Sequence, residues 1–114
     1  MPWIFDPHSG GDVVPANNRA SIAAKIEVFS YTRRWSSRFK LQPRFKGQFC
    51  YIDVLDGSGN KPDPLCRLRY FSMTSWSFSF YTWSNEQYQP CAFPSGEMLG
   101  TVEEAIVACE MHLC

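Results

Sequence analysis

The sequence predicts an α+β fold in which an antiparallel meander of four to five strands packs against an N-terminal and a C-terminal helix. Apolar residues recur at helical spacing within residues 19–34 and after residue 101, and they alternate with polar residues at strand spacing between these segments. The chain lacks the regular alternation of strands and helices that indicates a parallel sheet. One helical stripe is about as wide as one sheet face requires, so we expect a layer of helices on the sheet.

A chain of 114 residues is expected to form one domain. Aromatic residues make up 16% of the chain, and the formal net charge of zero argues against a general binder of polyanions. Residues 1–18 contain three prolines and a Gly-Gly pair, so we predict a flexible N-terminal arm there. The single folded domain is predicted to span residues 19–114.

The first helix is predicted from Ile22, Ile26 and Phe29, whose spacings of four and three residues are typical of a buried helix face. Asn17 or Asn18 is the expected N-terminal cap. The end of this segment also alternates β-branched and aromatic residues, so a strand remains an alternative there.

Strand patterns fill the middle of the chain. The first strand is amphipathic and contains Pro43, which cannot donate a ladder hydrogen bond and therefore favours the edge of the sheet. Loop-forming residues from 56 to 64 separate the second strand from the third. The strands are predicted at residues 39–46, 49–55, 65–71 and 75–83, with a short fifth strand within residues 86–93.

The closing helix is predicted to begin at Thr101, because Thr101 and Glu104 have the spacing of a capping box. Its apolar stripe is expected to pack on the sheet. This stripe consists of Val102, Ala105, Ile106, Cys109 and Leu113.

The loop between the third and fourth strands decides which residues share a face of the sheet. A three-residue loop from Met73 to Ser75 pairs Tyr70 with Phe78 and keeps the apolar residues together. In this register the other face holds two arginines and two aromatic residues, with Arg67 opposite one of the aromatics. We therefore predict an aromatic–arginine face, formed by Arg67, Arg69, Tyr81 and Trp83, in which Arg67 lies opposite Tyr81.

Two interpretations of this face are open. The N-terminal arm or the first helix could cover it, which would make its aromatic residues a second small core with an arginine stacked over them. Alternatively, the face is an open platform that stacks a flat ligand, a nucleic-acid base or a side chain of a partner. Self-association through the same face is a further alternative.

Basic residues are concentrated between residues 19 and 46, where eight of them accompany one acid, Glu27. Four glutamates and no basic residue lie between residues 97 and 110. The basic segment could contact phosphate groups, or it could be a solvated strand face that complements the acidic helix within the chain or across a dimer. The possible basic surface comprises Arg33, Arg34, Arg38, Lys40, Arg44 and Lys46.

No set of residues has the pattern of a catalytic or metal site. Cys109 and His112 are three residues apart on the closing helix, but two ligands do not form a metal site. Asp53, Asp56 and Asp63 lie around a loop that lacks the spacing of a calcium loop. The sequence therefore predicts no catalytic residue, no metal and no cofactor.

The cellular location is predicted from the cysteines and the N-terminus. Five cysteines form no C-x-x-C pair, and the N-terminus lacks the basic start and apolar run of a secretory signal. No segment has the length and hydrophobicity of a membrane span. We therefore expect a cytoplasmic protein with reduced thiols and no membrane partner.

The predicted helix is followed by a Leu-Arg-Tyr strand at residues 68–70 and by aromatic-rich segments at residues 76–78 and 81–83. In this order the chain resembles small uncharacterised bacterial domains, of the kind also found among proteins of mobile gene cassettes (integron cassettes). The resemblance covers residues 19–92, and it implies no activity and no catalytic residue.

The predicted function is that of a small binding domain, which contacts a ligand or a macromolecular partner through the aromatic–arginine face. The alternative is a homo-oligomeric structural protein with the same face as its subunit interface. An enzyme of unknown chemistry is the third possibility. Among partners, a protein or a second copy of the chain is expected before nucleic acid.

Overall fold

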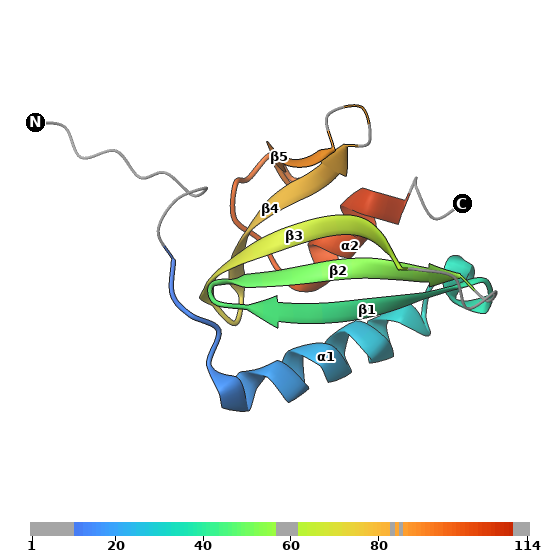
Figure 1. Cartoon of the computed structure of the whole chain (residues 1–114), viewed down its shortest axis with the longest axis horizontal. Coiled ribbons are helices and arrows are strands. Elements are labelled where there is room, and N and C mark those ends of the chain that lie inside the picture. The colour runs from blue at the N-terminus through green and yellow to red at the C-terminus, as the bar shows by residue number, and fades with distance from the viewer. Residues whose placement is uncertain (1–10, 57–61, 83, 85, 111–114) are drawn as a thin grey trace, which may run out of the picture.

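The computed structural model describes residues 11–56, 62–82, 84 and 86–110. They form a five-stranded antiparallel sheet in the order β1-β2-β3-β4-β5 together with two α-helices (Figure 1), which confirms the predicted α+β meander. In chain order the elements are α1 (Ala16–Ser30), the 3-10 helix η1 (Arg34–Ser37), β1 (Phe39–Lys46), β2 (Phe49–Asp56), β3 (Asp63–Ser72), β4 (Ser75–Thr82), β5 (Gln87–Cys91) and α2 (Val102–Cys109).

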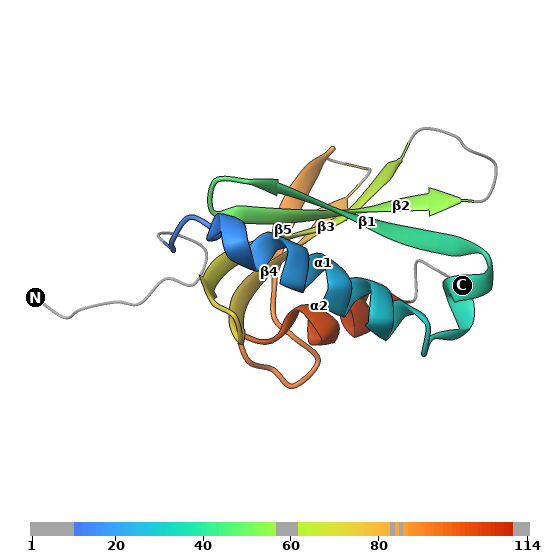
Figure 2. The ribbon, with the colours of Figure 1, turned by 90° about the horizontal axis from the view of Figure 1, so that it is seen from below.

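Both α-helices lie on the same side of the sheet, as Figure 2 shows. We call the sheet face that contacts them the inner face. Because side chains alternate along a strand, every second residue of each strand points to this face. Its central residues are at most 3% exposed, and they are Cys50, Ile52, Cys66, Leu68, Trp76 and Phe78.

The first helix begins earlier than predicted. α1 starts at Ala16, and Pro15 precedes it without a side-chain cap hydrogen bond, so neither Asn17 nor Asn18 is the cap. The carbonyl of Pro15 accepts the N–H of Asn18 at 2.9 Å, which places both asparagines in the first turn. The helix continues to Ser30, so the strand alternative for the preceding residues is wrong.

The segment before α1 belongs to the folded domain from residue 11 onward. Val14 is completely buried, and its N–H donates to the carbonyl of Gly47 at 3.0 Å. Gly11 has a φ of +86°, and a Cβ there would lie 2.7 Å from the carbonyl oxygen of Tyr70, so only glycine fits this approach. The domain boundary predicted at residue 19 therefore lies too late, and the rest of the predicted arm, residues 1–10, is outside the described residues.

The turn between β3 and β4 is shorter than predicted. Met73 and Thr74 form a two-residue turn that pairs Ser72 with Ser75, so the predicted three-residue loop is wrong. If such a turn were followed by strands in regular register, arginines would lie beside the aromatic residues of the core. For this reason the sequence favoured a longer loop.

A β-bulge at Phe71 removes this conflict. Tyr70 pairs with Trp76 and Leu68 pairs with Phe78, while Phe71 stands opposite no residue of β4. The pairing is thereby shifted by two residues from the predicted one. Because side chains alternate with a period of two, this shift changes each residue's partner and leaves its face unchanged.

The closing helix has the predicted start and the predicted buried stripe. The hydroxyl of Thr101 accepts the N–H of Glu104 at 3.2 Å, and the Glu104 carboxylate accepts the N–H of Thr101 at 3.1 Å, which completes the capping box. The buried residues of α2 are Val102, Ala105, Ile106 and Cys109, and Leu113 lies outside the described residues.

The predictions for the two edge strands are confirmed. β1 is an edge strand and contains Pro43, and β5 forms the other edge as the short fifth strand.

Among the described residues, neither helix has the length and apolar character that a membrane crossing requires. Cys50, Cys66, Cys91 and Cys109 are free thiols, and burial raises the pKa of Cys50 to about 12, so this thiol is unreactive at neutral pH.

Candidate functional site on the outer sheet face

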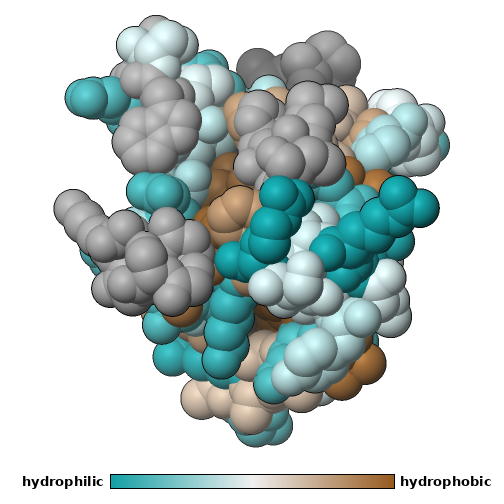
Figure 3. Space-filling view, turned by 90° about the vertical axis from the view of Figure 1, so that its right-hand side faces the viewer, coloured by the Kyte–Doolittle hydropathy of each residue, from teal (hydrophilic) through white to brown (hydrophobic). Residues whose placement is uncertain are grey.

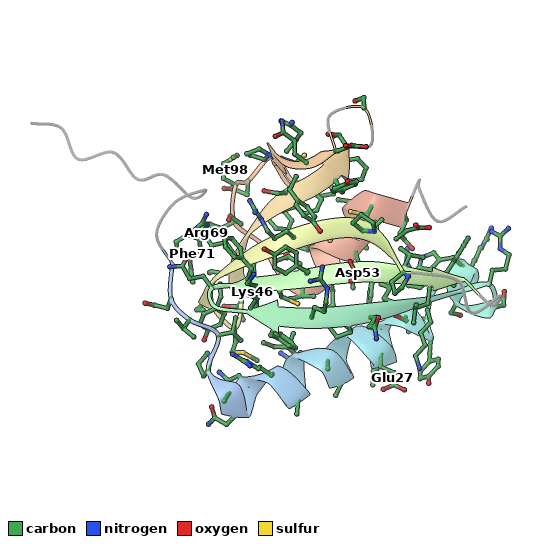
Figure 4. All side chains as sticks on the ribbon, viewed as in Figure 1. Glu27, Lys46, Asp53, Arg69, Phe71 and Met98 are labelled. Carbon is green, nitrogen blue, oxygen red and sulfur yellow. The ribbon has the colours of Figure 1, made fainter. Side chains whose placement is uncertain are left out.

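We call the sheet face that points away from α1 and α2 the outer face. Figure 4 looks onto it, with Lys46, Asp53 and Arg69 labelled. All five strands contribute residues to it through their alternating side chains. Its central residues are Arg44 from β1, Phe49, Tyr51 and Asp53 from β2, Arg67 and Arg69 from β3, Ser77, Ser79 and Tyr81 from β4, and Tyr88 and Pro90 from β5.

The structure describes three of the four residues that the sequence predicts for the aromatic–arginine face. Arg67, Arg69 and Tyr81 lie on the outer face, with Arg67 opposite Ser79 rather than opposite Tyr81. Trp83 lies outside the described residues. The first helix does not cover this face, because α1 packs on the opposite side of the sheet, so that part of the covered-face interpretation is wrong.

Guanidinium groups stack on aromatic rings across neighbouring strands. Arg67 lies between two rings, with its guanidinium carbon 4.5 Å from the ring centre of Phe49 and 5.2 Å from that of Tyr88. Arg69 also stacks on Phe49, at 4.7 Å, and donates from Nη1 to the side-chain oxygen of Gln48 at 2.9 Å. These contacts hold two positive charges close to one ring, in an arrangement that cation–π attraction stabilises.

The tyrosines of the outer face contact one another edge to face. The ring of Tyr88 lies 5.6 Å from that of Tyr51 and 5.1 Å from that of Tyr81, with interplanar angles of 64° and 70°. Each of these rings is half-buried, although neither helix covers them. Burial raises the pKa of the Tyr88 phenol to about 12, with a smaller contribution from the negative charge of Asp53, so Tyr88 remains a neutral hydroxyl near pH 7.

Asp53 is the acidic residue at the centre of the outer face, and Arg44 pairs with it. Asp53 is only 6% exposed, and its carboxylate accepts the Nε–H of Arg44 at 2.8 Å. This hydrogen bond raises the pKa of Arg44, and the same guanidinium stacks on Tyr51 at 4.7 Å. The pair is electrically neutral, so the charges of Arg67 and Arg69 leave the centre of the face positive.

A small hollow lies between the two arginines of β3. It has a volume of about 50 Å³, and six side chains line it. Two of them, Ser77 and Ser79, are 2% and 5% exposed. The lining residues are Phe49, Arg67, Arg69, Ser77, Ser79 and Pro90. This hollow combines hydroxyl and guanidinium groups with two apolar walls, and none of its described lining residues is acidic.

The predicted basic residues do not form one surface. Lys40, Arg44 and Lys46 lie on the outer side of β1, and β2 separates them from the arginines of β3 on the same sheet face. Arg34 and Arg38 instead lie at η1, at the end of the molecule that faces the viewer in Figure 3, where hydrophilic side chains cover much of the surface. The structure therefore unites part of the predicted basic surface with the aromatic–arginine face and separates the rest from it.

Arg33 has a structural role in the helical layer. Its Nε–H donates to Glu110 at 2.6 Å, its Nη2 contacts the second carboxylate oxygen, and the indole of Trp35 donates to Glu110 at 2.8 Å. The hydrogen bonds from Arg33 lower the pKa of Glu110. Arg33 thus connects the basic segment to the acidic helix within one chain, which is one of the interpretations left open by the sequence.

Several residues of the outer face escaped the sequence analysis. Phe49 and Tyr51 lie in an uninterrupted apolar run, so their alternation with buried neighbours is hidden. Asp53 has the same parity as both and is the signal that could have assigned them to the outer face. Ser77 and Ser79 carry their own signal, because they alternate with three aromatic residues of β4.

No metal site is found in the part of the chain that the structure describes, since no group of three or more histidine, cysteine, aspartate or glutamate side chains comes together there. Cys109 belongs to the core beneath α2. His112 lies outside the described residues.

Comparisons of the chain with protein-family models, with curated proteins and with solved structures give no match. The resemblance to small bacterial domains therefore stays a prediction.

Proposed function

We propose that the protein is a small binding module whose outer face holds a ligand that combines a planar ring with a negative charge. The chemistry that fits best is that of a nucleotide or a short single-stranded nucleic acid. One observation carries this proposal: half-buried aromatic rings and guanidinium groups alternate on a sheet face that neither helix covers.

Rings and guanidiniums on this face have complementary roles in such binding. The rings of Tyr51 and Tyr88 offer π surfaces, on which any base can stack. Arg67 forms no ion pair with the described residues, so its charge is available to a phosphate group. Local charge outweighs the net charge of zero here, because exposed charges are screened beyond about 10 Å at ordinary salt concentrations.

Stacking is tested with a fluorescently labelled single-stranded oligonucleotide and anisotropy at low salt. Tyr88→Ala is expected to weaken binding by about 1–3 kcal/mol, the range for the loss of one stacking ring. The matched control is Tyr31→Ala, since Tyr31 is 73% exposed and directly follows α1, in the helical layer. Equal effects of the two substitutions, or no binding by the unaltered protein, would refute the proposal.

The contribution of charge is tested by the salt dependence of the same binding. Arg67→Gln is expected to reduce the slope of log Kd against log salt by about 0.7, the value for one phosphate contact with a single strand. Lys25→Gln on the exposed surface of α1 is the control and is expected to leave the slope unchanged.

Light scattering tests the alternative, in which the outer face is a subunit interface. In that case the unaltered protein is a dimer, and Tyr88→Ala converts it to a monomer. Our proposal instead expects the same mass for both proteins in the absence of ligand.

A further inference from the structure

The hollow between the β3 arginines has the composition of a small anion site. It is lined by two guanidinium groups, two hydroxyls, one aromatic ring and one proline, and its volume is about 50 Å³. A volume of roughly 10–15 Å³ already admits one water molecule. The hollow therefore has room for an ion of a few heavy atoms, and it is too small for a nucleobase.

Two serines with little exposed surface line the hollow. Ser77 and Ser79 are 2% and 5% exposed, and neither hydroxyl hydrogen-bonds to any residue that the structure describes. Neither hydroxyl oxygen is among the buried polar atoms that lack a partner, which fits hydroxyls that open into the hollow. A bound anion there can accept a hydrogen bond from each of them.

The two arginines add positive charge from the same strand. Arg67 and Arg69 both stack on the ring of Phe49, with their guanidinium carbons 4.5 and 4.7 Å from its centre, and both line the hollow. An anion in the hollow is therefore attracted by both positive charges. Among the described residues no carboxylate lines the hollow, so they offer a metal cation or an ammonium group no ligand of opposite charge.

We propose that this hollow binds a phosphate group, with the Ser77 and Ser79 hydroxyls and the Arg67 guanidinium as hydrogen-bond donors. A tetrahedral phosphate offers several acceptor oxygens, which suits donors that approach from the base and from the wall of a hollow. This inference deepens the proposed function and rests on it, because it assigns the phosphate of the nucleotide ligand to a particular site.

The position of the hollow also orients the rest of the ligand. Phe49 forms one of its walls, and Arg67 connects Phe49 to the ring of Tyr88, which contacts Tyr51. A phosphate in the hollow therefore directs the attached sugar and base toward the tyrosines of β2 and β5. A terminal phosphate fits better than an internal one, because the hollow admits little beyond the phosphate itself.

The experiment compares five probes by NMR titration and calorimetry: inorganic phosphate, a nucleoside 5′-monophosphate, the same nucleoside without phosphate, and a short single strand with and without a 5′-phosphate. We expect inorganic phosphate to shift the amide signals of Ser77, Ser79 and Arg67. The nucleoside monophosphate is expected to bind more tightly than either the nucleoside or inorganic phosphate. A terminal phosphate on the strand is expected to increase its affinity.

The decisive variant is the double substitution Ser77→Ala and Ser79→Ala, which removes both hydroxyls with little change of volume. It is expected to weaken binding of phosphate and of the nucleoside monophosphate roughly tenfold or more, the usual effect of losing hydrogen bonds to a charged group. Binding of the nucleoside without phosphate is expected to stay the same. Ser21→Ala on the exposed surface of α1 is the control.

Failure of this inference is distinguishable from failure of the proposed function. If the double variant binds all phosphorylated probes as the unaltered protein does, the hollow is not the phosphate site. In that case binding of the strand can still depend on Tyr88, which would leave the proposed function intact. If no probe binds at all, both proposals are wrong.

Discussion

The two faces of the five-stranded sheet bury aromatic rings by different means. On the inner face, Trp76 is completely buried, donates its indole N–H to the carbonyl of Met73 at 3.2 Å and contacts the ring of Tyr70 at 5.0 Å. On the outer face, Tyr51 and Tyr88 are half-buried by each other and by the guanidinium groups beside them.

This difference shows that aromatic residues on both faces of a strand do not require two apolar cores. Tyrosine rings and arginine guanidinium groups of the outer face cover one another in place of an apolar layer. The inner face contributes stability through complete burial, whereas the outer face keeps ring and guanidinium surface available. Substitutions on the two faces should therefore differ in size and in kind.

The largest effect is expected on the inner face. Trp76→Ala should reduce the free energy of unfolding by about 3–5 kcal/mol, since it removes a fully buried ring and leaves a cavity. Urea unfolding followed by circular dichroism measures this loss. A reduction below about 1 kcal/mol would mean that the inner face is not the main core.

The comparison becomes sharper at two consecutive residues of β2 that point to opposite faces. Tyr51→Ala should lower the free energy of unfolding by only about 1 kcal/mol. The substitution removes a half-buried ring and its edge contact with Tyr88, so little buried surface is lost. Ile52→Ala, which removes a completely buried side chain, should cost about 2–5 kcal/mol. Equal losses in urea unfolding would mean that the outer face is a second core.

A substitution that removes the cap of α2 tests whether binding at the outer face depends on this helix. Thr101→Ala removes the hydroxyl that accepts the N–H of Glu104, so the free energy of unfolding should fall by about 1 kcal/mol. Oligonucleotide binding under native conditions should stay unchanged, because α2 lies on the other side of the sheet. A weaker affinity in the folded variant would show that the outer face depends on this helix.

The smallest effect is expected in the pH dependence of stability. Hydrogen bonds from Arg33 lower the pKa of Glu110 in the folded protein, so the contribution of this group is present above its unfolded pKa of about 4.3 and is lost as the pH falls through the lower folded pKa. Glu110→Gln should therefore flatten the decline of stability in that acidic range. Urea midpoints measured from neutral to acidic pH test this, and an unchanged profile would contradict the assignment.

Local features of the sequence were sufficient to predict most elements. The capping box at Thr101 and Glu104 predicted the start of α2, because both partners lie within one turn of the helix. Pro43 predicted that its strand lies at the edge of the sheet, because a proline has no N–H to donate to a neighbouring strand. This property also depends on a single residue and on no distant segment. The alternation along β3 and β4 correctly assigned Arg67, Arg69 and Tyr81 to one face.

Tertiary structure decided the features that depend on distant segments. The two-residue turn with a bulge at Phe71 and the predicted three-residue loop give the same two faces, so alternation by itself could not distinguish their registers. The side of the sheet on which α1 packs is likewise a property of the whole fold. It leaves the aromatic–arginine face without a helix over it.

The sequence by itself determined that Arg67, Arg69 and Tyr81 share one face of the sheet, because the period of a strand is fixed by its backbone. Only the tertiary structure brought Phe49, Arg67, Ser79 and Pro90 together around one hollow, since they come from four different strands. Their contacts depend on the register of three strand pairs, and each register is set by packing and turn geometry between residues that are distant in the chain.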